Sequence, residues 1–266
     1  MKGNLQSEFL YQVFALVLAA ILVHAIYVTV IRPNAAEDLA EQQRLAQQQE
    51  DYVPERSFWI VVRDYEQETC FILMLWAMAI MGYKAVGALR ERRLLEESLI
   101  PIPEGISVLP EDSRDYMRPL QALDEETRDY LLPRTLLAAL QRFASTRNVQ
   151  DVSEAVHAVC ESESDRLDSE LSMVRYIAWA IPSIGFIGTV RGIGDALGQA
   201  HQAVEGDIAG VTESLGVAFN STFIALVISI VVMFLMHQLQ LLQDRLVLDT
   251  HGYADTRLIR HLQVRE

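Results

Sequence analysis

The sequence predicts an all-α, polytopic membrane protein with four transmembrane helices and long helices that extend into a cytoplasmic helical region. Two observations support this fold class. Apolar residues, 51% of the 266, are concentrated in four runs of about 20 residues, the length at which a helix crosses a bilayer. The arginines gather on one side of these runs, as expected for an inner-membrane protein.

The first two runs are rich in bulky apolar residues. Residues 9–31 contain no Asp, Glu, Lys or Arg and exceed the length of a signal-peptide core, so they predict an uncleaved helix. Residues 70–89 contain one charge, Lys84, which lies near the end of the run. Its long side chain can therefore reach the membrane interface.

The last two runs, 173–194 and 215–236, indicate the direction of the spans. The connector 90–172 holds ten arginines, whereas the connector 195–214 has no Lys or Arg. Because basic residues remain on the cytoplasmic side, the first connector is expected in the cytoplasm and the second outside. With four spans, both termini are then cytoplasmic.

The expected organisation follows from these positions. It comprises 1–31 as the N-terminus and transmembrane helix 1, 32–69 as a periplasmic segment, 70–89 as transmembrane helix 2, 90–172 as a cytoplasmic helical region, 173–194 as transmembrane helix 3, 195–214 as a periplasmic loop, 215–236 as transmembrane helix 4 and 237–266 as a cytoplasmic C-terminal helix.

Helical patterns also occur outside the spans. Residues 35–49 are rich in Ala, Glu, Gln and Leu and predict a helix that extends the first span and is ended by Pro54. Residues 151–172 predict another helix, which runs into the third span. Between them, an apolar stripe follows a proline-rich stretch and consists of Leu131, Leu132, Leu136, Leu137 and Leu140.

Several functional classes are disfavoured by the composition. A net charge of −14 argues against nucleic-acid binding, which relies on basic surface. Cys70 and Cys160 are far apart and are expected to be packing residues. The sequence has no glycine-rich phosphate loop, no metal-ligand spacing and no nucleophile–histidine arrangement, so neither an enzyme nor a cofactor site is expected.

The third and fourth spans differ from the first two because each carries small and polar residues along one helix face. On the third span these are Pro182, Gly185, Thr189 and Gly192, and on the fourth they are Ser214, Ala218, Ser221, Thr222, Ala225 and Ser229. Such stripes allow membrane helices to pack closely. They are equally compatible with a narrow polar path lined by hydroxyl groups.

Acidic residues are missing from the interiors of all four runs. Glu213 lies at the outer end of the fourth run, and His24 is the one titratable group in the middle of a span. A lone histidine there more often marks packing than a proton relay. Since proton paths need an ionisable group in the membrane, a proton-binding carboxylate would come from another polypeptide.

Three segments resemble the MotA/TolQ/ExbB proton-channel family. Residues 181–193 read IPSIGFIGTVRGI, and the family's signature helix similarly has a proline followed by glycines and Gly-Thr-Val. Residues 210–215 read GVTESL and resemble the family's Gly-x-x-Glu-x-Leu motif at the start of the last span. Residues 217–223 read VAFNSTF, similar to the flagellar-stator form of that helix. The subfamily is not assigned.

The resemblance implies a pentamer of long helices around a central pore. It also implies a partner of the MotB/TolR/ExbD type, whose single span carries the proton-binding aspartate. By position, Thr189 matches the pore threonine, Pro182 the family's proline and Glu213 the glutamate that begins the second pore helix. The expected ion path comprises Thr189, Thr222, Pro182, Ser221 and Ala218, with Glu213 and Arg191 as charges at its mouth and Gly185, Gly188 and Gly192 as packing residues.

Two positions depart from the family pattern. Ala218 stands where ExbB and TolQ have a threonine, and Thr222 follows one turn later on the same face. Arg191 occupies a position that is usually uncharged, and a cation there would repel protons unless it pairs, for example with Asp195 or with the partner. The alternatives to a proton-driven motor are a sodium-driven version of it and a non-conducting membrane scaffold.

Overall fold

The computed structural model describes residues 2–48, 57–103, 106–204 and 208–264, and nearly all of these residues are helical. In this part of the chain, strand-like pairing is limited to one bridge between Val108 and Leu262. Four helices are long and apolar enough to cross a membrane, at Ser7–Leu45, Tyr65–Glu96, Val149–Gly198 and Ala209–His261. The expected all-α membrane protein with four such helices is thereby confirmed.

The chain divides into two compact units, which we describe separately. The membrane unit consists of Met1–Met81 and Met173–Met236, and the polar unit of Gly82–Ser172 and His237–Glu266.

The first membrane helix is continuous through a proline. It consists of α1 (Lys2–Ile26), a π-helical turn η1 (Tyr27–Ile31) and α2 (Arg32–Gln48). Pro33 has no N–H to donate to the preceding turn, and the π-turn accommodates this defect, with the Arg32 N–H donating to the Tyr27 carbonyl. The Asn34 side chain donates to the Val30 carbonyl at 2.6 Å. Helix therefore extends beyond the first apolar run as expected, while Pro54 lies outside the described residues.

The second membrane helix, α4 (Tyr65–Arg93), follows a short helix, α3 (Phe58–Val62). The helix α4 is antiparallel to α1, since Trp76 donates to the Gln12 carbonyl at 2.9 Å and Tyr11 to the Ala79 carbonyl at 3.2 Å. It begins five residues before the expected span, with acidic side chains in its first turn. Negative charge is favourable at a helix N-terminus.

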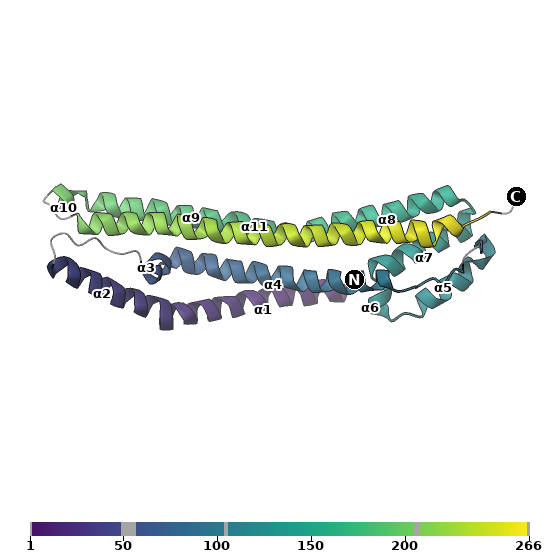
Figure 1. Ribbon diagram of the computed structural model, residues 1–266, viewed down its shortest axis with the longest axis horizontal. Helices are drawn as coiled ribbons and strands as arrows, with labels where there is room; N and C mark the ends of the chain where they lie inside the picture. Colours follow the sequence, from purple (N-terminus) through teal and green to yellow (C-terminus); the bar gives the residue numbers. More distant parts are fainter. Residues whose placement is uncertain (1, 49–56, 104–105, 205–207, 265–266) are drawn as a thin grey trace. The chain divides into compact units, whose positions relative to one another are not determined.

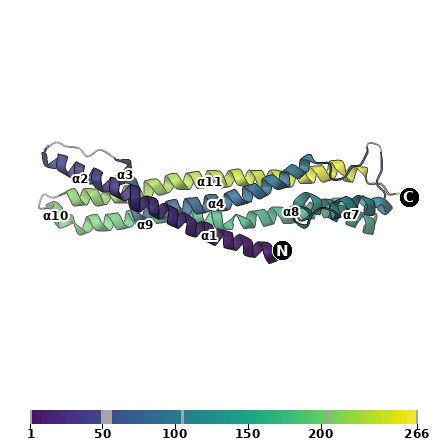
Figure 2. The same cartoon turned by 90° about the horizontal axis from the view of Figure 1, so that it is seen from below.

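The third and fourth membrane helices are α9 (Ser172–Gly198) and α11 (Ala209–Arg257), with the short α10 (Ala200–Val204) between them. Both views show α9 and α11 side by side (Figure 1, Figure 2). The 49 residues of α11 span about 74 Å, which exceeds the hydrocarbon thickness of a bilayer. Before α9, α8 (Val149–Glu170) is separated from it only by Leu171, close to the unbroken helix expected.

The polar unit is a helical bundle around an apolar core. Its remaining elements are η2 (Leu94–Glu96), η3 (Pro110–Asp112), α5 (Ser113–Gln121), α6 (Glu125–Arg128), α7 (Leu131–Thr146) and η4 (Ile259–His261). The leucine stripe of α7 packs into this core, where Leu136 and Leu140 are fully buried and meet Val152 of α8 and Leu258. Of the stripe, only Leu137 is partly exposed.

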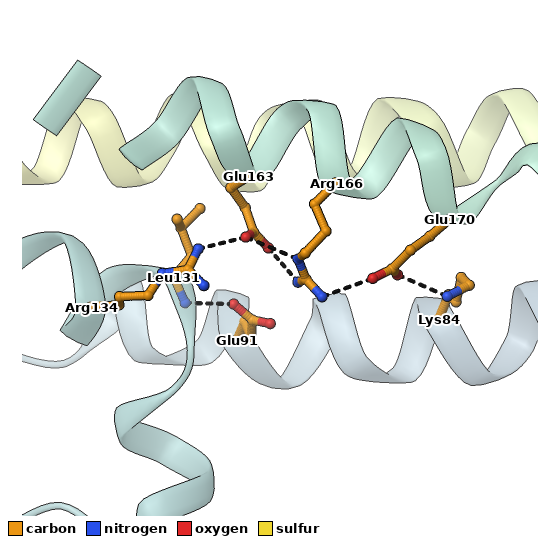
Figure 3. Close-up of polar contacts among 7 residues, drawn as sticks. All are labelled: Lys84, Glu91, Leu131, Arg134, Glu163, Arg166 and Glu170. Carbon is orange, nitrogen blue, oxygen red and sulfur yellow. Dashed lines mark hydrogen bonds and ion pairs between the residues drawn. The ribbon is translucent and has the colours of Figure 1, made fainter. Parts of the chain in front are cut away.

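A chain of ion pairs links α4, α8 and α7 within the polar unit (Figure 3). Lys84 binds Glu170 at 2.8 Å, and Arg166 binds the other oxygen of Glu170 at 2.8 Å. Glu163 accepts from both Arg166 and Arg134, although its side chain is only 3% exposed. A buried carboxylate is stabilised only while such partners remain, so the charge of Glu163 depends on its contacts with the two arginines.

The replacement Glu163→Gln should lower the free energy of unfolding by about 2 kcal/mol, because two arginines lose their buried acceptor charge. Thermal unfolding in detergent measures this loss. The control is Glu161→Gln, an exposed position on the same helix, which should change stability by less than about 0.5 kcal/mol. Equal stability of the two variants would contradict the role assigned to Glu163.

Candidate functional site

Three glycines of α9 allow α11 to approach closely. The contacts pair Gly185 with Ala225, Gly188 with Ser221 and Gly192 with Ala218. A Cβ atom at Gly188 would lie 2.5 Å from Ser221 Cβ, and one at Gly192 would lie 2.8 Å from Ala218 Cβ. These separations leave no room for a side chain on α9, and the facing residues of α11 are almost fully buried.

Pro182 is compensated by a residue of the opposite helix. A proline within α9 leaves the carbonyl of Ala178 without its usual N–H donor, because that bond would come from residue 182. The hydroxyl of Ser229 on α11 donates to this carbonyl at 3.2 Å, and Ser229 is 5% exposed. The proline and the last serine of the α11 stripe thus form one interaction, which satisfies a backbone group inside the membrane unit.

Thr189 and Thr222 bring their hydroxyl groups together at this contact. Their Oγ1 atoms are 2.5 Å apart. Thr222 Oγ1 also lies 3.0 Å from the Gly185 carbonyl oxygen, and Thr189 Oγ1 lies 3.0 Å from the Ala218 carbonyl oxygen. The threonine that accepts from the other can donate its own proton to its carbonyl. Because a hydroxyl has one proton and two acceptor positions, the pair has alternative arrangements in which either threonine donates to the other.

Arg191 is paired within the membrane unit, but not with Asp195. Its guanidinium forms two contacts with the carboxylate of Glu66 on α4, Nε to Oε1 at 2.8 Å and Nη2 to Oε2 at 2.8 Å. The sequence offered Asp195 as one example of a counter-charge for Arg191, and the structure pairs Arg191 with Glu66 of another helix. A two-point contact of this kind is stronger and more specific than the single i,i+4 contact that the sequence suggested.

Glu213 is also held by a residue just before α4. Arg63 Nη2 lies 2.7 Å from Glu213 Oε1, and Arg63 Nε lies 3.6 Å from the carboxylate of Asp64. Burial raises the pKa of Asp64, while the positive charges of Arg63 and Arg191 act in the opposite direction. The glutamate at the start of α11 is therefore not a free charge.

His24 has a polar partner rather than a purely apolar environment. Its Nδ1 lies 2.6 Å from one oxygen of Glu68, whose side chain is 8% exposed. Arg32 binds the other oxygen of Glu68 and stacks over the Tyr65 ring, 4.4 Å from its centroid. Since His24 belongs to the first apolar run, this carboxylate lies alongside a residue that the sequence places inside a span.

The structure therefore separates the predicted residues into two sets. Those of the expected ion path gather on the α9–α11 contact, namely Thr189, Thr222, Pro182, Ser221 and Ala218. The two mouth charges, Arg191 and Glu213, instead contact residues at or before the start of α4.

Sequence reasoning missed Glu66, Glu68 and Arg63. Glu66 is 125 residues from its partner and Arg63 is 150 residues from its own. The available signal was the cluster of one arginine and three acids within residues 63–68, just before an apolar run.

The comparison with known families bears on the same helices. Residues 128–251 match the sequence profile of the MotA/TolQ/ExbB proton channel family. The match covers α7 and α8, all of α9 and most of α11, and so includes both threonines. No curated protein matches the chain. The family resemblance drawn from the sequence is confirmed.

The replacement Gly192→Ala should destabilise the α9–α11 contact by about 1–3 kcal/mol, because the new Cβ has no room. It would lie 2.6 Å from the Ser214 carbonyl oxygen. The control is Gly194→Ala, where nothing lies within 4 Å; it should be neutral or stabilising by up to about 1 kcal/mol, since alanine favours helix. Thermal unfolding in detergent distinguishes the two variants, and an unaffected Gly192→Ala variant would show that the helices are not in close contact.

Proposed function

We propose, from the match of residues 128–251 to the MotA/TolQ/ExbB proton channel family, that the chain is the channel-forming subunit of a proton-driven membrane motor. In this proposal it acts as a conduit and not as an enzyme. It resides in a bacterial inner membrane with both termini in the cytoplasm, in keeping with the arginine-rich 90–172 connector.

The hydroxyl pair of Thr189 and Thr222 is the observation that carries the proposal. It joins two membrane helices in the family-matched segment, with oxygen atoms 2.5 Å apart. Because either hydroxyl can donate to the other, the pair can hydrogen-bond to a protonated group that moves past it, and no fixed charge is needed in the membrane. Alanine at these positions would also allow the two helices to approach closely, so close approach alone does not require two hydroxyls.

The proton-binding carboxylate is proposed to come from a partner. Neither 173–194 nor 215–236 contains Asp or Glu, and a proton path needs an ionisable group. A single-span protein of the MotB/TolR/ExbD type would supply an aspartate inside a pentameric ring of this chain. Arg191 would repel protons if it were unpaired, but the carboxylate of Glu66 balances its charge.

The driving force follows from the membrane potential. An aspartate neutralised by a periplasmic proton passes the threonine pair and releases the proton on the cytoplasmic side. Each charge that crosses 100 mV supplies about 2.3 kcal/mol. Repeated transfers would turn the ring relative to the partner and deliver work outside the membrane.

Replacing both threonines with alanine should abolish proton uptake while the complex still assembles, because alanine removes both hydroxyls without placing methyl groups where the two oxygens lie 2.5 Å apart. Uptake is measured with a pH-sensitive dye inside liposomes that contain the purified complex. Thr256→Ala, at an exposed position further along α11, is the control and should retain uptake. Full conduction by the double variant would remove the threonines from the path, and uptake that requires sodium would indicate the sodium-driven version.

Native mass spectrometry of the complex purified together with its partner tests the assembly. Five copies of this chain with two copies of a single-span protein would support the motor architecture. A monomer or dimer without such a protein would refute it, and the glycine and hydroxyl stripes would then serve a scaffold.

A further inference from the structure

Three acidic residues around the start of α4 each lie beside an arginine. Asp64 contacts Arg63, Glu66 contacts Arg191 of α9, and Glu68 contacts Arg32 at the start of α2. Arg63 in turn reaches Glu213 of α11. We call these seven residues the α4 charge cluster. It connects α4 to each of the other three membrane helices within the membrane unit.

The pair Glu66–Arg191 is the member of the cluster closest in sequence to the threonine pair. Arg191 follows Thr189 by two residues, a rise of about 3 Å along the helix axis. Glu66 is well buried, with its side chain 12% exposed, whereas Arg191 is 44% exposed. Glu66 is therefore the more buried partner of the pair, and Arg191 is the more exposed one.

Gly188 gives Glu66 its position. A Cβ atom at Gly188 would lie 3.1 Å from Glu66 Cγ, so the absence of a side chain on α9 makes room for α4 as well as for α11. From this place Glu66 meets the guanidinium in a two-point contact, the geometry in which arginine and carboxylate bind best. The same glycine that allows the α9–α11 contact thus also allows the charge of Arg191 to be balanced.

Arg191 keeps its positive charge, which only a neighbouring anion can balance. A guanidinium is not deprotonated in proteins, and near a medium of low dielectric constant its field acts over a long range. A cation approaching the threonine pair would therefore be repelled by an unpaired Arg191.

We infer that Glu66 is a positioning residue of the ion path: it neutralises Arg191 and holds it against α4, so that a periplasmic proton can reach the partner's carboxylate beside Thr189 and Thr222. This role rests on the proposed function. Glu66 itself does not bind the transported proton; it acts through Arg191. The competing explanation is that the pair is only a mechanical link between α4 and α9.

Two variants separate neutralisation from a mechanical link. Glu66→Gln removes the carboxylate that directly contacts Arg191, whereas the double variant Glu66→Gln/Arg191→Gln removes both charges and the link. If the role is neutralisation, the single variant loses proton uptake by about tenfold and the double variant regains it to within about twofold. If the pair is a link, the double variant is impaired at least as much as the single one.

The experiment measures proton uptake into liposomes by the purified complex, with native mass spectrometry and thermal unfolding on the same samples. Asp115→Asn is the charge-matched control, since it removes one negative charge from an exposed ion pair on α5, and it should conduct like the wild type. Loss in the single variant with recovery in the double variant supports the inference.

Either of two results would overturn the inference and leave the proposed function intact: a Glu66→Gln variant that conducts normally, or a double variant without recovery. A wild-type complex that does not conduct would be a different result. It would refute the proposed function, and the role of Glu66 with it.

Discussion

The close approach of α9 and α11 depends on backbone positions of α9 that carry no side chain. Glycines on one face of α9 meet small residues on α11, and this proximity brings several polar groups of the contact within reach of a partner, whereas the Ser221 hydroxyl is buried without a hydrogen bond to any described residue. The Thr189 and Thr222 hydroxyls meet each other and two carbonyls. Ser229 reaches the carbonyl that Pro182 leaves free. In a membrane, where water does not satisfy such groups, the same geometry provides both the packing and the polar surface.

The α4 charge cluster follows a related constraint. Charged groups in or near a bilayer persist when they are paired, since an isolated buried charge is far more costly. Glu66 and Glu68 are 12% and 8% exposed, and each has an arginine at contact distance. Their partners lie on other helices of the membrane unit. Charge pairing therefore fixes how α4 contacts its neighbours more specifically than apolar contact with bulky residues would.

Most residues of the α4 charge cluster lie outside the family-matched segment. The match begins at residue 128, so Glu66, Glu68 and Arg63 lie outside it. Arg191 lies inside the segment and departs from the family pattern, and its partner lies outside. A resemblance that includes the last two spans but not the first two draws attention to the threonines and glycines. It does not indicate how an unusual charge in that segment is balanced by a helix elsewhere in the chain.

The sequence by itself determined the four membrane helices, the small-residue faces of the last two, the leucine stripe of α7 and the resemblance to the MotA/TolQ/ExbB family. These features are local, because apolar length and helical periodicity are read within a single segment. The tertiary structure alone decided that Arg191 binds Glu66 instead of Asp195, that His24 contacts Glu68, and that Ser229 compensates Pro182. Each of these contacts joins residues from different helices, and the rotation and depth of one helix against another are set by packing, which no pattern within a single segment encodes.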